Sequence, residues 1–229
     1  MESAVRKDTF WGVAPYERPS AEEVATTQRK RLLLGITRAV AKKGYAAVSV
    51  ADVLKEVRVS RRTFYEMFKD KEDCYLAAYD LAHDATIEYI KESQRGISES
   101  FERIERAHRA YLEFICKHPE LAIAFSVGVV EAGPRASDRR QRAFQEFADL
   151  HAVLHRQCRA QHPEVPEVPR LALVALTAGT NIVVMDELRR CGVGKVMALL
   201  PVILYLSCSV YGVTKLAERY PSRPSRTAR

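Results

Sequence analysis

The feature that most constrains the fold is the spacing of apolar residues, which follows the period of an α-helix over most of the chain. No segment alternates convincingly between apolar and polar residues, as a half-buried strand would. Glycine and proline residues interrupt the helical pattern. The predicted helices cover about 20–43, 50–57, 61–69, 71–94, 98–117, 119–131, 137–161, 168–190 and 194–218. The sequence therefore predicts an all-α protein.

Three short signals define the helices near the N-terminus. Ser20 to Glu23 have the form of a capping box, and Gly44 follows a lysine-rich last turn, so the first helix should begin and end there. Ser49 and Ser60 are typical N-caps for the next two helices. The third helix should bury a face made of Phe64, Met67 and Phe68. Its opposite face carries Arg61, Arg62, Tyr65 and Lys69. Two short helices joined by a tight turn predict a helix-turn-helix.

The positive charge of the chain is concentrated in this part of the sequence. The whole chain has 36 basic and 29 acidic residues, a net charge of +7, whereas residues 28–71 alone carry 12 basic and 4 acidic residues, or +8. A patch of this kind is expected where a protein contacts DNA phosphates. A solvated helix face is the alternative explanation for charge alone.

A motif supports the first explanation. Val59 to Lys71 read VSRRTFYEMFKDK, and Glu72 then continues the next helix. This segment resembles the DNA-binding region of TetR-family repressors of the TetR/AcrR type, and its SRRTFY stretch is similar to members common in actinobacteria. The resemblance covers residues 20–80. It implies DNA contacts by the following residues: Ser49, Ser60, Arg61, Arg62, Thr63, Tyr65 and Lys71.

Within that set the expected roles differ. Arg61 and Arg62 can bond to guanine edges or grip phosphates, and the sequence leaves both roles open. By resemblance, Ser49 caps its helix against a phosphate and Lys71 meets a phosphate at the start of the next helix. One departure is Arg58, which stands where the family usually has a glycine in a left-handed conformation.

The resemblance also implies a second domain. The predicted organisation is a flexible tail at 1–19, a DNA-binding domain at 20–70, a ligand-binding and dimerisation domain at 71–220 and a disordered basic tail at 221–229. The last two helices would pair with the same helices of a second copy, because Val196 to Val213 contain no charged residue. Leu204 is expected in that interface. The same segment is also long enough to span a membrane, although Pro201 and several polar residues lower its apolarity.

Polar residues on otherwise apolar helices are candidates for binding an effector. These are His108, Tyr111, Thr177 and Asn181, with Glu131 as a weaker candidate. The resemblance implies an effector pocket, and we expect an apolar or amphipathic small molecule bound among helices 98–190, which these residues do not identify.

A histidine-rich stripe suggests a metal-responsive alternative. His151, His155, Cys158 and His162 share one helical face, but the same spacing fits an ordinary packing seam, so we assign no metal or cofactor. The five cysteines form no C-x-x-C pair, which favours a reducing cytoplasm. The chain lacks familiar catalytic motifs.

We therefore expect a cytoplasmic homodimeric repressor, and not an enzyme. It should bind a palindromic double-stranded operator and be released by a small-molecule effector. The operator, effector, regulated genes and sign of regulation are not determined by the sequence. A helical enzyme and a membrane-anchored scaffold are the alternatives from other classes.

Overall fold

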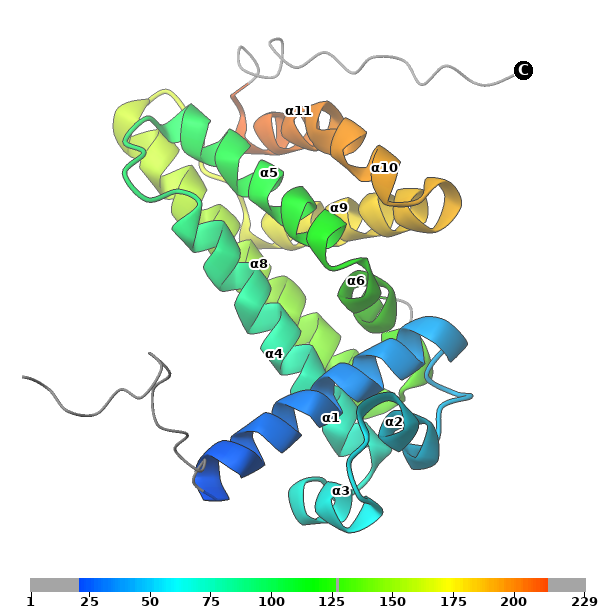
Figure 1. Ribbon diagram of the computed structural model, residues 1–229. Coiled ribbons are helices and arrows are strands. Elements are labelled where there is room, and N and C mark those ends of the chain that lie inside the picture. The colour runs from blue at the N-terminus through cyan, green and yellow to red at the C-terminus, as the bar shows by residue number, and fades with distance from the viewer. Residues whose placement is uncertain (1–20, 127, 214–229) are drawn as a thin grey trace, which may run out of the picture.

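The computed structural model describes residues 21–126 and 128–213, and every regular element in these two ranges is helical (Figure 1). The helices are α1 (Ala21–Lys43), α2 (Val50–Val57), α3 (Arg61–Met67), α4 (Lys71–Glu92), α5 (Ser100–Lys117), α6 (Pro119–Ser126), α7 (Gly128–Glu131), α8 (Pro134–Gln161), α9 (Arg170–Cys191), α10 (Val193–Val196), a 3₁₀ turn (Met197–Leu199) and α11 (Leu200–Tyr211). The predicted all-α class is confirmed. The capping residue Ser20, the two tails and residues 214–218 of the last predicted helix lie outside the described residues.

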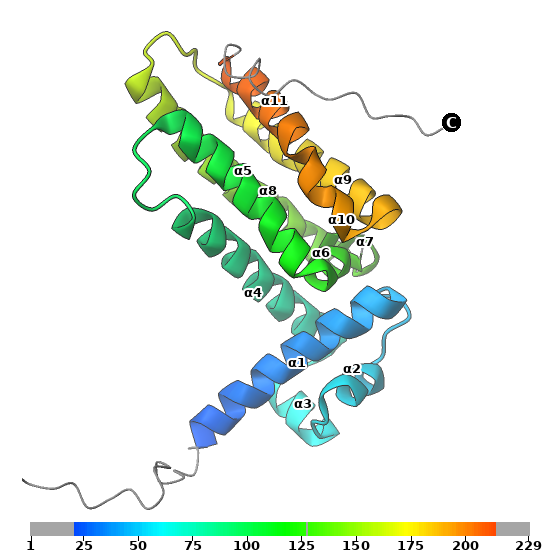
Figure 2. The same cartoon turned by 45° about the horizontal axis from the view of Figure 1, so that its top comes forward.

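The helices form two groups connected by α4. Helices α1, α2 and α3 form a unit at one end of the molecule, and α4 runs from this unit towards the larger group (Figure 1). In that group α5 and α8 lie between α4 on one side and the adjacent α9 and α11 on the other (Figure 2). The arrangement leaves one face of α3 and one face of the α9–α11 pair without covering helices.

Two apolar cores follow this division, but their boundary does not fall at residue 70. The N-terminal core contains Phe64 and Phe68 of the third helix and also Tyr75 and Tyr79 of α4. Ala124, Phe125, Val129, Ala132, Ala136 and Ala143 of α6, α7 and α8 complete it. The start of α4 and the α6–α8 region therefore pack as part of the DNA-binding unit. The predicted domain limits remain predictions.

Several helix boundaries differ from the predictions for local reasons. The predicted helix 119–131 is two helices, α6 and α7, and Gly128 approaches Val40 of α1 so closely that an added Cβ would lie 2.8 Å from its Cγ1 atom. The predicted helix 194–218 is three segments. Pro201 lies at the start of α11, and Gly212 ends it in a left-handed conformation with φ of 74°. Helix α8 begins early because Pro134 favours the first turn.

Leu204 was wrongly predicted as an interface residue. Its side chain is fully buried within the single chain, in the core shared with α5 and α9. The large apolar residues that α11 exposes are instead Val202, Tyr205 and Leu206. A helix with no charges has no polar face to indicate which side is inward, so the sequence did not distinguish these positions.

Two stretches, Arg170–Cys191 and Val193–Tyr211, have the length and apolarity to cross a membrane. Core helices of globular proteins can also have this composition. In this structure their inward residues, including Leu176, Val184 and Ile203, pack in the core with α5 and α8. This packing buries 39% of the first stretch and 33% of the second, and the exposed apolar residues require another explanation.

Candidate functional site

The turn before α3 has the left-handed backbone conformation that the family resemblance implied at Arg58, where the family usually has a glycine. Arg58 has φ of 52° and ψ of 46°, the only non-glycine residue with positive φ in the described chain. Its N–H donates to the carbonyl of Leu54 at 3.1 Å, which closes α2. A side chain in this conformation costs about 1–2 kcal/mol relative to glycine. The turn that joins α2 to α3 therefore includes a strained backbone conformation at Arg58.

The start of α2 is fixed by a capping box. The Ser49 hydroxyl accepts from the Asp52 N–H, and the Asp52 carboxylate accepts from the Ser49 N–H at 3.0 Å. Lys43 of α1 donates to the same carboxylate at 2.6 Å. Hydrogen bonds from Lys43 and Ser49 hold the pKa of Asp52 well below its usual range. The expected cap at Ser49 is present, and a contact of Ser49 with phosphate remains a prediction.

Helix α3 is held by its aromatic face and presents its polar face to solvent. Phe64 is fully buried and Phe68 is nearly so, whereas Tyr65 is half exposed. Ser60 caps the helix, because its hydroxyl accepts from the Thr63 N–H at 3.0 Å. The capping group thus also fixes Thr63, whose own hydroxyl lies 2.8 Å from that of Ser60.

Two arginines extend from the exposed face of α3. The side chain of Arg62 is 89% exposed and its Nε lies 2.9 Å from Glu66, an exposed ion pair that contributes little to stability. The Arg61 guanidinium lies 5.9 Å from the centre of the Tyr65 ring. Both guanidinium groups are therefore free to exchange these neighbours for DNA.

Lys71 is engaged within the protein. Its ammonium group donates to the carbonyls of Tyr45 and Val48 at 2.9 and 2.8 Å and lies 4.1 Å from the Tyr45 ring centre. Burial lowers the pKa of this lysine. The ammonium thus ties the start of α4 to the loop between α1 and α2. A phosphate contact by its third N–H remains a prediction.

Glu131 connects the two groups of helices instead of lining a cavity. Its carboxylate accepts from the Ala46 N–H at 3.1 Å, in the loop that precedes α2. The Tyr75 hydroxyl, from α4, donates to the Ala124 carbonyl of α6 at 2.9 Å. These two hydrogen bonds therefore join α7 to the loop before α2 and α6 to α4.

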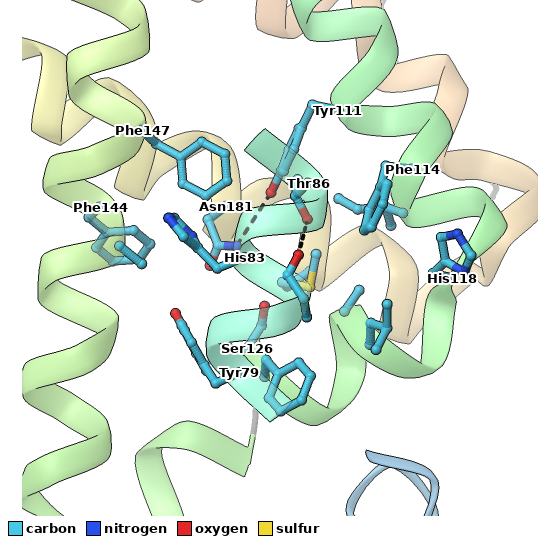
Figure 3. Close-up of a pocket in the computed structure, with 17 residues that line it drawn as sticks. Tyr79, His83, Thr86, Tyr111, Phe114, His118, Ser126, Phe144, Phe147 and Asn181 are labelled. Atoms are coloured by element: carbon cyan, nitrogen blue, oxygen red, sulfur yellow. Dashed lines mark hydrogen bonds between the residues drawn. The ribbon is translucent and has the colours of Figure 1, made fainter. Parts of the chain in front are cut away.

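A first cavity of about 90 Å³ lies between α4, α5, α6, α8 and α9. Aromatic residues dominate its wall, and Figure 3 shows Phe144 and Phe147 of α8 on one side of it and Phe114 of α5 on the other. Tyr111 and Asn181 also line it, and the Asn181 amide donates to the Tyr111 hydroxyl at 3.4 Å (Figure 3). The wall of this cavity is therefore mostly apolar, with polar groups from the following residues: Tyr79, His83, Thr86, Tyr111, His118, Ser126 and Asn181.

A second cavity of about 60 Å³ lies farther along α5, α8 and α9. The four candidate effector residues, His108, Tyr111, Thr177 and Asn181, all contribute to its wall. Tyr111, Asn181, Phe144 and Phe147 line both cavities. The structure thus brings together the four residues that the sequence suggested, and their role as ligand contacts remains a prediction.

Sequence reasoning missed a polar cluster beside the first cavity. His83 of α4 lies 2.6 Å from Glu146 of α8, and Arg139 bonds to both Asp80 and Glu146. His83 also lines the cavity. The signal available in the sequence was the spacing of Tyr79, His83 and Thr86 on one helical face, but the partner residues lie on a distant helix.

The histidine stripe on α8 has separate partners. The Nδ1 atom of His151 lies 2.6 Å from the Tyr211 hydroxyl, and the Nε2 atom of His155 lies 3.0 Å from the Pro166 carbonyl. His162 stacks on Phe101. In the described residues, no group of three or more His, Cys, Asp or Glu side chains has the arrangement of a metal site. The stripe therefore works in packing and hydrogen bonding here.

The fold and the exposed arginines of α3 define a helix-turn-helix DNA-binding regulator. Residues 32–78 match the family model of the bacterial regulatory proteins of the tetR family. The N-terminal unit is thus similar to the DNA-binding domains of that family. A search of curated protein sequences finds no match.

Solved structures show the same fold over most of the chain. The fatty acid degradation regulator FadR from Bacillus halodurans is 15% identical, with a TM-score of 0.70, covering 83% of this chain and 96% of its own. FadR from Bacillus subtilis, in complex with stearoyl-CoA, is 18% identical, with a TM-score of 0.67 and coverage of 79% and 97%. A TetR-like regulator from Rhodococcus sp. RHA1 is 18% identical, with a TM-score of 0.61 and coverage of 84% and 99%.

Proposed function

We propose that this protein is a cytoplasmic, ligand-responsive repressor without catalytic activity, which binds a palindromic operator as a homodimer. The observation that carries the proposal is the geometry of α3. Its aromatic face is buried while Arg61, Arg62 and Tyr65 are exposed on the most basic part of the chain. Such a helix can enter the major groove while the rest of the unit contacts phosphates.

The DNA contacts divide by chemistry. Arg61 and Arg62 are the candidates for reading base edges, since a guanidinium can bond bidentately to guanine. The remaining predicted contacts, from Ser49, Ser60, Thr63, Tyr65 and Lys71, position α3 against the backbone. The SRRTFY sequence of this helix supports the actinobacterial type of the family.

The dimer would form through the exposed faces of α9 and α11. Leu171 is 79% exposed, Ile182 is 61% exposed and Tyr205 is 52% exposed in the single chain. An added Cβ at Gly179 would meet no atom within 4 Å, so this part of α9 is open for close approach by another helix. Exposed apolar surface of this kind is typical of a protein interface. The partner would be a second copy, and no membrane is required.

The effector would occupy the two cavities. Their volumes are smaller than the roughly 300–1,000 Å³ of most ligand pockets, so binding must open them. Phe144 and Phe147 line both cavities, and rotation of these rings would join the two spaces. An elongated apolar or amphipathic molecule fits this shape. One similar structure holds stearoyl-CoA, a ligand of this general kind.

Effector binding would reach the DNA through α4 and α6. Both helices line the first cavity, and both contact the DNA-binding unit. A ligand that moves them changes the separation of the two recognition helices in the dimer. Since coupling is reciprocal, operator DNA must weaken effector binding by the same factor.

The decisive experiment is selection of operator fragments from random DNA by the purified full-length protein, followed by titration at two salt concentrations. We expect a palindromic sequence, with affinity falling by about 10³-fold or more between 50 and 200 mM salt if six or more phosphates are neutralised. Recovery of no preferred sequence would contradict the proposal. A scrambled duplex of equal length is the control.

A further inference from the structure

The second cavity has polar groups but no charged wall. Its lining residues on α5, α8 and α9 include His108, His151, Thr177 and Thr180, together with apolar and aromatic side chains, and no Lys, Arg, Asp or Glu is among them. A carboxylate or phosphate placed there would have no opposite charge, which is costly in a buried site. The wall therefore suits an uncharged ligand group.

One polar atom in this wall lacks a partner. Thr180 is 6% exposed, and its hydroxyl oxygen is buried without a hydrogen bond. The neighbouring Thr177 differs, because its hydroxyl donates to the Leu173 carbonyl at 3.0 Å. Buried hydroxyl groups are nearly always paired, and an unpaired one costs free energy. The Thr180 hydroxyl is thus available to a ligand.

The histidines of the cavity are held by residues of α11. The Tyr211 hydroxyl lies 2.6 Å from Nδ1 of His151, and the Ser207 hydroxyl lies 2.7 Å from Nε2 of His108. The Tyr211 hydroxyl also lies 3.5 Å from the His151 carbonyl, and we assign its proton to the shorter contact with Nδ1, which places the His151 proton on Nε2. Burial lowers the pKa of His108 to about 3, with a smaller contribution from His151, and burial lowers the pKa of His151 to about 4. Both rings are neutral at pH 7.

We propose that the second cavity is the subsite for an uncharged carbonyl oxygen on an otherwise apolar effector, with Thr180 and His151 donating hydrogen bonds to it. This assignment rests on the proposed effector function and adds the chemical class of the ligand group. The carbonyl would be that of a ketone, ester or amide. The apolar remainder would extend past Phe144 and Phe147 into the aromatic first cavity.

The volumes fit this division of the ligand. A space of about 60 Å³ exceeds the 10–15 Å³ needed for one water molecule, so it accommodates a small group of atoms around a carbonyl. It does not accommodate a long chain. The first cavity is larger, has a mostly aromatic wall and receives the chain.

The test compares two probes of matched shape, 2-octanone and 2-methyl-1-octene, in which a methylene group replaces the ketone oxygen. Their affinities for the full-length protein are measured by calorimetry for the wild type, Thr180→Val and Thr37→Val. The Thr180→Val variant should bind 2-octanone about 2- to 10-fold more weakly, the value of one hydrogen bond, and should bind the alkene as tightly as the wild type does. Its thermal stability should not fall, because the hydroxyl has no partner in the free protein.

Thr37→Val is the matched control, since its buried hydroxyl already donates to the Leu33 carbonyl at 2.8 Å and the residue lies on α1, in the wall of neither cavity. It should leave the ratio of the two affinities unchanged. Equal effects of Thr180→Val on ketone and alkene would overturn the carbonyl subsite, as would tighter binding of octanoate than of 2-octanone by the wild type. If neither neutral probe binds, the proposed effector cavity itself is wrong, and the carbonyl subsite with it.

Discussion

The exposed face of α3 and the exposed faces of α9 and α11 lie far apart in the molecule and have opposite chemistry (Figures 1 and 2). The first displays arginine side chains over a buried aromatic pair. The second displays leucine, isoleucine and tyrosine side chains over a buried core. Exposed guanidinium groups are stable in water, whereas a large apolar surface is not. The comparison teaches that one face suits a polyanion and the other a second protein chain.

The largest expected effect comes from placing a charge on the apolar face. Ile182→Glu should convert the dimer into monomers, because a carboxylate in the interface would be buried without a partner. A monomer contacts one half-site of the operator instead of two, which removes several kcal/mol of binding free energy. Operator affinity should then fall by about 100-fold or more. Light scattering and operator titration measure the two effects.

Leu81→Glu is the control for this change. Leu81 is also exposed, at 51%, but it lies on α4, outside the proposed interface. This variant should remain dimeric. A dimeric Ile182→Glu protein with wild-type stability would place the interface elsewhere and break the comparison.

The next effect concerns the arginines of α3. Arg61→Ala and Arg62→Ala should each weaken operator binding by about 1–3 kcal/mol. Loss of preference at one base position indicates base reading, and an equal loss on all sequences indicates phosphate binding. Titration against operator and scrambled duplexes separates these outcomes. Arg156→Ala, on the exposed side of α8, should bind like the wild type, and a folded double variant of Arg61 and Arg62 that does so would refute the role of α3.

A smaller effect is expected in the pH dependence of stability, which a buried histidine changes and an exposed arginine of the DNA-binding face does not. Burial lowers the pKa of His108 to about 3 in the folded protein, against about 6.5 in the unfolded chain. Protonation therefore favours unfolding, and stability is lost as the pH falls below about 6.5. His108→Gln should reduce the slope of unfolding free energy against pH by about 1 kcal/mol per unit between pH 6 and 5.

The measured quantity is the slope of unfolding free energy against pH. Lost packing in the variant lowers the unfolding free energy equally at every pH and leaves this slope unchanged. Denaturant unfolding at several pH values supplies the data. Arg61→Ala should retain the wild-type slope. An unchanged slope in His108→Gln would show that this histidine is not buried in the neutral form.

The smallest effect is expected at the turn before α3. Arg58→Gly should relieve about 1–2 kcal/mol of left-handed strain but should increase the entropy of the unfolded chain, which offsets about 0.4–1 kcal/mol. A net stabilisation of about 0 to 1.6 kcal/mol should remain, measurable by thermal unfolding. Operator affinity should fall equally for all sequences if Arg58 contacts a phosphate. Clear destabilisation would contradict the strained conformation.

The sequence by itself determined the helical class, the helix-turn-helix and its cap at Ser60. These features depend on local rules, because capping residues, glycine stops and helical spacing act within one or two turns of chain. The same rules predicted that Phe64 and Phe68 would be buried and that Arg61 and Arg62 would be exposed. The four effector candidates were also chosen from a local pattern, because they are polar residues on otherwise apolar helices.

Only the tertiary structure decided which residues of the uncharged last helix face inward. It placed Leu204 in the core and exposed Tyr205, because contacts with α5 and α9 orient a helix whose own sequence has no polar side. The tertiary structure also brings the Lys71 ammonium into hydrogen-bonding distance of the carbonyls of Tyr45 and Val48. It places the Thr180 hydroxyl in a cavity wall without a hydrogen-bond partner. Such relations join helices that are distant in sequence, and no local pattern encodes them.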